Sequence, residues 1–192
     1  MKKMLYLLFL ALTISCQENS KTSEEAIAHN NDLLSMTFKD FREIEIFEKY
    51  EKAFDTAIYT GGWEDDFRLL HLRETNENLV LFYKVVDRQQ NTGENTFRVL
   101  DTLQIRNLRQ DEEIIIGYCY NQNYYEGELV AVAEKTDSLV AQKILKVWRA
   151  NPASGAVEAV ENFKGIICLS LDYEDNGQPV SIKHLNLQSR VD

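Results

Sequence analysis

Histidine and cysteine are scarce in this sequence, and their scarcity narrows the chemistry that it can support. The 192 residues include three histidines and three cysteines. The motifs G-x-S-x-G, H-E-x-x-H and C-x-x-C are all absent, which removes the usual signatures of acyl-transfer, zinc-dependent and thiol-redox sites. His71 alternates with Leu70 and Leu72, so its ring is expected on the polar face of a strand. We therefore expect no enzymatic activity, no metal site and no cofactor.

Basic charge is also in short supply. The chain carries 21 lysine and arginine residues against 31 aspartate and glutamate residues, for a formal net charge of −10. No basic cluster reverses this balance locally, so nucleic acids and anionic lipid headgroups should repel the chain. We expect neither of them as a partner.

Long hydrophobic runs are absent as well. The apolar residues 4–14 cover about half of the roughly 20 positions that a helix needs to cross a bilayer. Lys2 and Lys3 precede this run, and the polar sequence QENSKTSEE follows it from residue 17. A basic start, a short apolar core and a small residue before a polar segment are typical of a secretory signal peptide.

The end of this segment, LTISC at residues 12–16, resembles the lipobox of bacterial lipoproteins. In that family a small residue precedes a cysteine that receives a diacylglycerol; Ser15 and Cys16 hold these places, whereas Thr13 stands where leucine is usual. The resemblance implies a signal peptide over residues 1–15, a lipid anchor at Cys16 and a tether over residues 16–35 in the cell envelope. Gln17, in place of the aspartate that retains some lipoproteins at the inner membrane, favours the outer membrane. An ordinary signal peptide cut nearby is the alternative.

Residues 36–192 are long enough for one domain with a sizeable core, and they open with an apolar repeat. Thr37 and Asp40 form an N-cap pattern, and Gly61 with Gly62 would end the element. Between them, apolar residues recur at spacings of three and four: Phe38, Phe41, Ile44, Phe47, Tyr50 and Phe54. This spacing predicts one N-terminal amphipathic helix.

From residue 67 onward the apolar period changes to two, which predicts strands. Eight segments show it: 67–73, 79–86, 97–105, 112–120, 128–134, 143–149, 165–173 and 180–187. In the third segment, for example, Phe97, Val99 and Leu103 are expected on one face. The breaks between the segments are short, and short connections join antiparallel neighbours. We expect a mainly β domain, an antiparallel meander of about eight strands that forms a barrel or a sandwich.

The triplet Gly61, Gly62 and Trp63 resembles the G-x-W that opens the first strand of lipocalins. That resemblance implies an eight-stranded barrel that carries a small apolar ligand. The helix predicted before the triplet, and the lack of the other lipocalin motifs, depart from the family pattern. A lipocalin-like carrier is therefore the alternative function.

Cys119 and Cys168 lie in the middle of two predicted strands, each on the face opposite the larger apolar residues of its strand. An exported protein reaches a compartment where disulfides persist, and the lipid would occupy Cys16. The arrangement predicts a cross-sheet disulfide, which would close a loop of roughly 50 residues and add about 3–4 kcal/mol of stability in the chain-entropy model. Two small buried residues with inert thiols are the alternative.

Four tyrosines flank the turn between two predicted strands: Tyr118, Tyr120, Tyr124 and Tyr125. Rings at a turn with polar or small neighbours are not drawn into a core, and tyrosine gives a large contact area at a low entropic cost. The sequence therefore predicts a binding surface, with one ring folded back over the sheet edge as the alternative. We expect an envelope lipoprotein whose non-enzymatic β-domain binds a partner protein or a glycan. A hydrolase whose site the sequence does not reveal is a further alternative.

Overall fold

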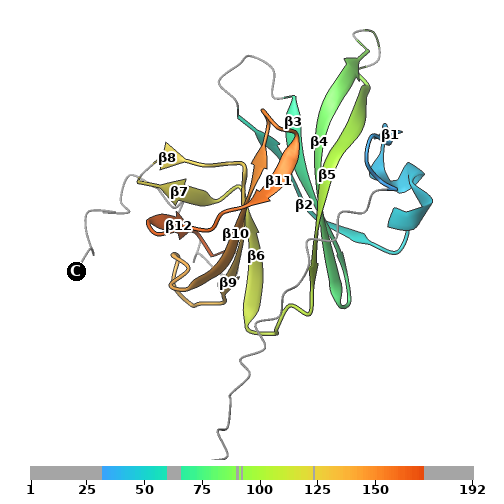
Figure 1. The fold of residues 1–192 in the computed structure, drawn as a ribbon. Coiled ribbons are helices and arrows are strands. Elements are labelled where there is room, and N and C mark those ends of the chain that lie inside the picture. Colours follow the sequence, from blue (N-terminus) through green and yellow to red (C-terminus); the bar gives the residue numbers. More distant parts are fainter. Residues whose placement is uncertain (1–31, 60–65, 90, 92, 123, 171–192) are drawn as a thin grey trace, which may run out of the picture.

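The computed structural model describes residues 32–59, 66–89, 91, 93–122 and 124–170 (Figure 1). The expected signal peptide, Cys16, the triplet 61–63 and the strand predicted over residues 180–187 lie outside these ranges. The described part is mainly β, as the sequence predicts, and all of its strand pairs are antiparallel. None of its helices has the length and apolar character needed to cross a membrane.

The largest sheet has five strands in the order β1-β5-β4-β3-β2. Its members are β1 (Thr37–Phe38), β2 (Glu51–Ile58), β3 (Phe67–Glu74), β4 (Glu77–Arg88) and β5 (Asn95–Arg106). β3, β4 and β5 contain the first three predicted segments, 67–73, 79–86 and 97–105. Those segments are rich in apolar residues and are bounded by short polar breaks, which is typical of strands. The two residues between β3 and β4 form a tight hairpin that fixes the register of the pair.

Two smaller sheets complete the fold. The second has the order β11-β10-β9-β6, built from β6 (Glu112–Ile116), β9 (Leu129–Glu134), β10 (Ile144–Asn151) and β11 (Ala156–Ala159). The third has the order β12-β7-β8, built from β7 (Cys119–Asn121), β8 (Tyr124–Tyr125) and β12 (Ile166–Cys168). Of the two architectures that the sequence left open, the described strands adopt the sandwich, and they do not close into a barrel (Figure 1).

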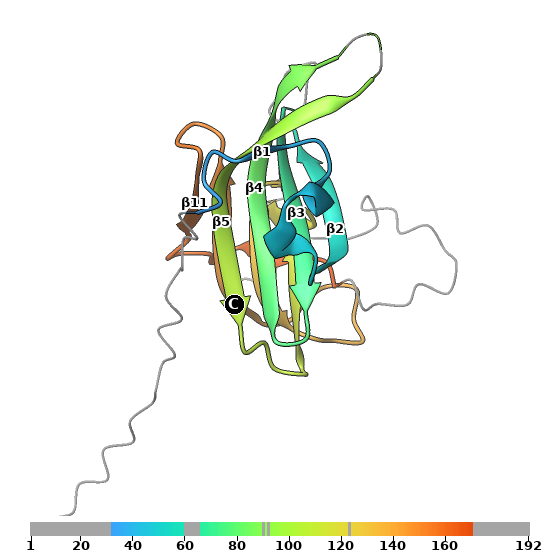
Figure 2. The same ribbon diagram turned by 90° about the vertical axis from the view of Figure 1, so that its right-hand side faces the viewer.

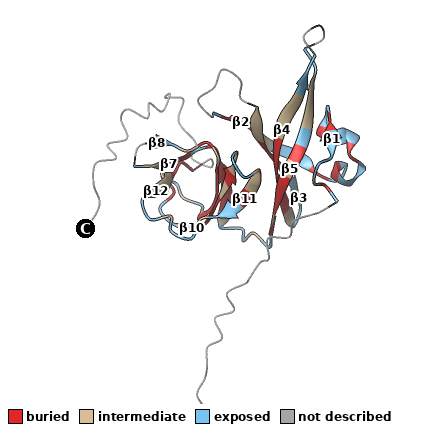
Figure 3. Cartoon of the chain, turned by 45° about the horizontal axis from the view of Figure 1, so that its top comes forward, coloured by how far each residue is buried: buried red, intermediate tan, exposed pale blue. Residues whose placement is uncertain are grey.

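Three apolar cores separate the layers, and Figure 3 shows buried residues along strands of the facing sheets. The first lies between the two larger sheets, where Phe82 and Leu103 pack with Val130. The second lies on the outer face of the five-stranded sheet, under the N-terminal segment. The third lies between the four-stranded sheet and the small sheet. Both larger sheets are therefore covered on both faces, which explains why residues 79–83 of β4 are all buried.

The prediction of an N-terminal amphipathic helix is wrong. The segment instead forms β1, two 3₁₀ turns named η1 (Phe41–Glu43) and η2 (Glu45–Phe47), and then β2, which contains Phe54. Figure 2 shows the turns lying across the outer face of the five-stranded sheet. Asp40, not Thr37, caps the first turn, because its carboxylate accepts a hydrogen bond of 3.0 Å from the backbone N–H of Arg42.

The spacing of the apolar residues accounts for this difference. From residue 38 to residue 50 they recur every three positions, and all five are buried: Phe38, Phe41, Ile44, Phe47 and Tyr50. A 3₁₀ turn has 3.0 residues per turn, so an uninterrupted period of three stays on one side of it. An α-helix has 3.6 residues per turn and would rotate the same residues away from the sheet.

A bulge in β5 corrects a second prediction, that Phe97, Val99 and Leu103 share one face. Phe82 pairs with Asp101 and the next residue, Tyr83, pairs with Val99, so Leu100 is an extra residue in β5. The bulge inverts the alternation at this point. Phe97 and Val99 therefore belong to the outer core, whereas Leu103 belongs to the core between the sheets.

Candidate functional site

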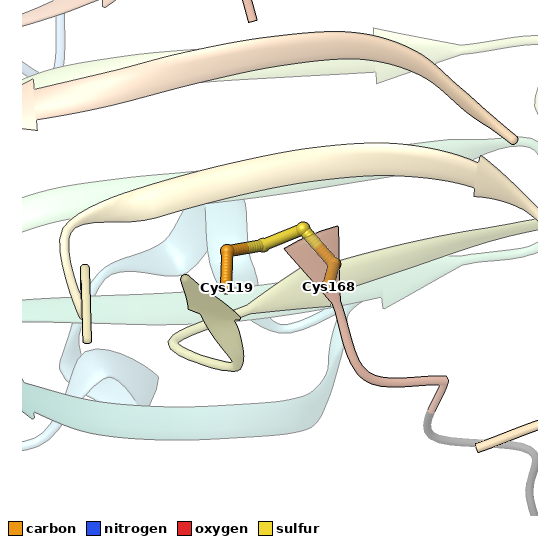
Figure 4. Close-up of a disulfide and its surroundings, with 2 residues drawn as sticks. All are labelled: Cys119 and Cys168. Atoms are coloured by element: carbon orange, nitrogen blue, oxygen red, sulfur yellow. A yellow bond between two sulfur atoms is a disulfide. The ribbon is translucent and has the colours of Figure 1, made fainter. Parts of the chain in front are cut away.

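A disulfide joins Cys119 of β7 to Cys168 of β12 (Figure 4). The sequence predicted this pair as a bond between two sheets, but the two residues face each other on neighbouring strands of one sheet, with their Cα atoms 4.0 Å apart. Both are fully buried and pack in the third core, under the four-stranded sheet. The bond ties the small sheet together and holds the short β7–β8 hairpin in place.

That hairpin carries the tyrosines predicted as a binding surface. The exposed fractions are 76% for Tyr124, 50% for Tyr125 and 38% for Tyr118, and we name these three exposed side chains together the tyrosine surface. Tyr120 is buried and does not belong to this surface, which corrects the sequence-based assignment. It is opposite Tyr125 in the strand register, and the Tyr125 ring covers it with 5.8 Å between ring centroids.

Two glycines lie beside the folded-back ring of Tyr125, and one of them, Gly127, creates the room for it. A side chain at Gly127 would place its Cβ only 2.9 Å from Tyr125 Cε1, so the ring packs directly on the glycine backbone. Gly117 has a φ of +72°, a conformation that favours glycine, and it divides the strand predicted over residues 112–120 into β6 and β7. Tyr125 is thus held against the sheet, whereas Tyr124 projects into solvent.

Charged groups lie beside the tyrosine surface. Arg149 of β10 contacts Glu126 at 2.6 Å through Nη2 and Glu128 at 2.7 Å through Nη1, and about one third of its side chain is exposed. Burial, and next the neighbouring Tyr120 and Tyr118, raise the pKa of Tyr125, so its hydroxyl stays a neutral hydrogen-bond donor at physiological pH. Aromatic faces, hydroxyl donors and a fixed guanidinium with its carboxylates are groups that suit recognition of a protein surface or a sugar.

A second feature is a cleft of about 270 Å³ between β2, β3 and β4 on one side and β6 on the other. We name it the histidine cleft, and define it by its lining residues Phe54, His71, Asn78, Leu108, Ile114 and Ile116. His71 is 8% exposed, so the prediction that it lies on a polar face is wrong. Both faces of β3 are covered by other layers, which leaves no polar face in this part of the strand.

The imidazole of His71 is neutral at physiological pH. Burial lowers its pKa below the usual value, and nearby Arg73 lowers it further, while a hydrogen bond to Asn78 partly offsets both. His71 Nε2 lies 3.0 Å from Asn78 Oδ1, and since an amide oxygen only accepts, Nε2 carries the proton. The other ring nitrogen, Nδ1, is therefore a hydrogen-bond acceptor.

No group of three or more histidine, cysteine or acidic side chains in the described ranges is arranged to hold a metal ion. Among the described residues that line the histidine cleft there is no serine, threonine or cysteine. Comparisons of the chain with protein-family models, with curated proteins and with solved structures find no match.

Proposed function

We propose that the chain is a lipid-anchored protein of the bacterial cell envelope, most simply of the outer membrane, whose sandwich binds a partner protein or a glycan without catalysing a reaction. The observation that supports it is the tyrosine surface, in which Tyr124 and Tyr125 are exposed on a hairpin held by a disulfide and Tyr118 is exposed just before it. A binding surface that is rigid before contact loses less conformational entropy when the partner binds. Tyrosine side chains in such a setting are common anchors of interfaces.

The proposed lipid anchor at Cys16 can be tested separately. The wild-type chain should incorporate a clickable fatty acid in metabolic labelling, because Ser15 and Cys16 match the acceptor pattern of lipoproteins. A Cys16→Ala variant should lose the label and should leave the membrane fraction, since stable anchoring depends on the acyl chains. Equal labelling of the two chains would contradict the lipid anchor.

For the binding surface we expect that Tyr124→Ala weakens capture of the partner about tenfold or more, the size typical of an exposed tyrosine at the centre of an interface. The partner is first isolated from native envelope extracts with the wild-type domain, and purified oligosaccharides are screened in parallel. The free energy of unfolding should change by less than about 0.5 kcal/mol, because Tyr124 is 76% exposed.

A matched control exists on another element. Tyr59, next to the end of β2, is 69% exposed, so Tyr59→Ala removes a ring of similar exposure outside the hairpin. This variant should capture the partner as the wild type does. If Tyr59→Ala and Tyr124→Ala weaken capture equally, or neither does, the tyrosine surface is not the binding site.

The lipocalin-like alternative is not supported by the described strands. It requires a closed barrel around a ligand cavity, whereas the described strands do not close and the space between the two larger sheets, apart from the histidine cleft, is packed with side chains such as Phe82 and Leu103. One observation favours the hydrolase alternative: the buried His71 lies in a cleft that Glu112 and Glu113 also line. We assign that cleft a different role.

A further inference from the structure

The walls of the histidine cleft combine apolar side chains with polar ones. Phe54 of β2, Leu108 from the loop after β5, and Ile114 and Ile116 of β6 all line it. Its volume of about 270 Å³ lies just below the range of roughly 300–1,000 Å³ that is usual for drug-sized ligands. A molecule of one or two fused rings fits this space better than a lipid or an oligosaccharide does.

One polar atom in the cleft has an open hydrogen-bonding position. The His71 residue is more than nine-tenths buried, but its Nδ1 atom retains some accessible surface in the cleft. A ligand that covers this atom without a hydrogen bond to it would bind at a cost in free energy. Nε2 is bonded to Asn78, but Nδ1 has no hydrogen bond to any other residue in the described part of the chain. A ligand with an N–H or O–H group would supply the missing donor.

The charged residues of the cleft cancel one another. Arg73 and Lys135 line it together with Glu112 and Glu113, two positive charges against two negative ones. Glu112 Oε1 is already engaged with Arg109 Nε at 2.9 Å. Because these four formal charges sum to zero, the cleft offers no net attraction that would offset the desolvation of a charged ligand.

We infer that the histidine cleft binds a small, uncharged aromatic compound that carries one hydrogen-bond donor, of the indole or phenol class, with the donor directed to His71 Nδ1. The site touches the tyrosine surface where Phe54 packs on Tyr118, with 5.8 Å between ring centroids, but none of its lining residues belongs to that surface, and the inference does not rest on the proposed partner binding. Failure of one proposal therefore leaves the other standing.

Indole and benzofuran provide a matched pair of probes, because they have nearly the same shape and only indole has an N–H donor. Isothermal titration of the full mature chain should show saturable binding of indole with a Kd below about 1 mM. Benzofuran should bind at least tenfold more weakly, since it would cover His71 Nδ1 and leave this acceptor without a donor. The methyl resonances of Ile114 and Ile116 should shift when indole binds.

Two variants locate the site. In His71→Leu, indole and benzofuran should bind with equal affinity, because the acceptor is gone and the apolar walls remain. Ala53 lines the cleft from an exposed position on β2, so Ala53→Trp should fill the opening and abolish binding of both probes without disturbing the core. If His71→Leu does not fold, the probe pair and Ala53→Trp still decide the matter.

Three results would overturn the inference. The first is an absence of saturable indole binding at millimolar concentration. The second is equal affinity of the wild type for indole and benzofuran, which would remove the role of His71. The third is unchanged indole binding in Ala53→Trp, which would place the probe elsewhere on the protein.

Discussion

Replacing Phe47 by alanine should lower the free energy of unfolding by about 3–5 kcal/mol, the range for a fully buried phenylalanine. Phe47 has no exposed surface, and its ring contacts Tyr50 edge to face with 6.4 Å between centroids. It is the most buried residue of the 3₁₀ segment, and it fills the core on the outer face of the five-stranded sheet. Equilibrium unfolding in urea, monitored by circular dichroism, measures the change.

The adjacent residue supplies the control. Ile46 is 45% exposed, so Ile46→Ala should change the stability by less than about 0.5 kcal/mol. The contrast between the two variants tests whether the N-terminal segment unfolds together with the sheet. Two backbone hydrogen bonds join the segment to β5: the Ser35 N–H donates to the Val99 carbonyl at 3.0 Å, and the Val99 N–H donates to the Met36 carbonyl at 2.9 Å. Similar small losses in both variants would mean that this segment does not unfold together with the sheet.

Loss of the disulfide is expected to have an effect of similar size. Cys119 and Cys168 are 49 residues apart in the sequence, and closing a loop of this length stabilises the folded state by about 4 kcal/mol in the chain-entropy model. The double variant Cys119→Ala/Cys168→Ala should therefore unfold at a much lower denaturant concentration than the oxidised wild type.

Reductant separates the bond from the packing of the two side chains. Adding it should bring the wild type close to the double variant, and it should leave the double variant unchanged. The hairpin that carries Tyr124 should also lose partner binding in both the reduced and the substituted chain, because the disulfide would no longer link β12 to β7. A stability loss below about 1 kcal/mol would show that the third sheet is held by its apolar contacts alone.

Much of the sheet structure could be predicted from the sequence, because an apolar period of two is a local signal. The segments predicted over 67–73, 79–86 and 128–134 correspond to β3, β4 and β9. The elements that were missed lack this signal. β11 has one buried residue, Val157, and β8 has two residues in all, so their pairing is decided by distant partners and not by their own pattern.

Two other errors have separate causes, one in the layered architecture and one in the spacing of the apolar residues. His71 was assigned to a polar face because the alternation of apolar and polar residues was taken to mean that its strand has a polar face. In the structure, apolar cores cover both faces of β3 at this point. The period of three from Phe38 to Tyr50 was in the sequence, but a single spacing of four to Phe54 made it resemble an α-helix. That last residue belongs to a separate strand.

Part of the candidate sites could be predicted from the sequence. The polar turn residues around Tyr124 indicated that its ring would be exposed, and the structure agrees. Tyr120 is buried because the strand register places it opposite Tyr125, and this register could not be predicted from the sequence. The histidine cleft could not be predicted, since it brings together β2, β3, β4 and β6, and only the packing of one sheet on another creates it.

The extra residue in β5 has a consequence for how this chain can change in length. Phe97 and Val99 serve one core and Leu103 serves another, and it is Leu100 that shifts the pattern between them. Deleting Leu100 would straighten the strand and leave every other side chain of β5 on its present face. Deleting Thr102 instead would turn one end of the strand inside out. Among related chains, gaps in this strand should therefore be tolerated at the bulge and excluded on either side of it.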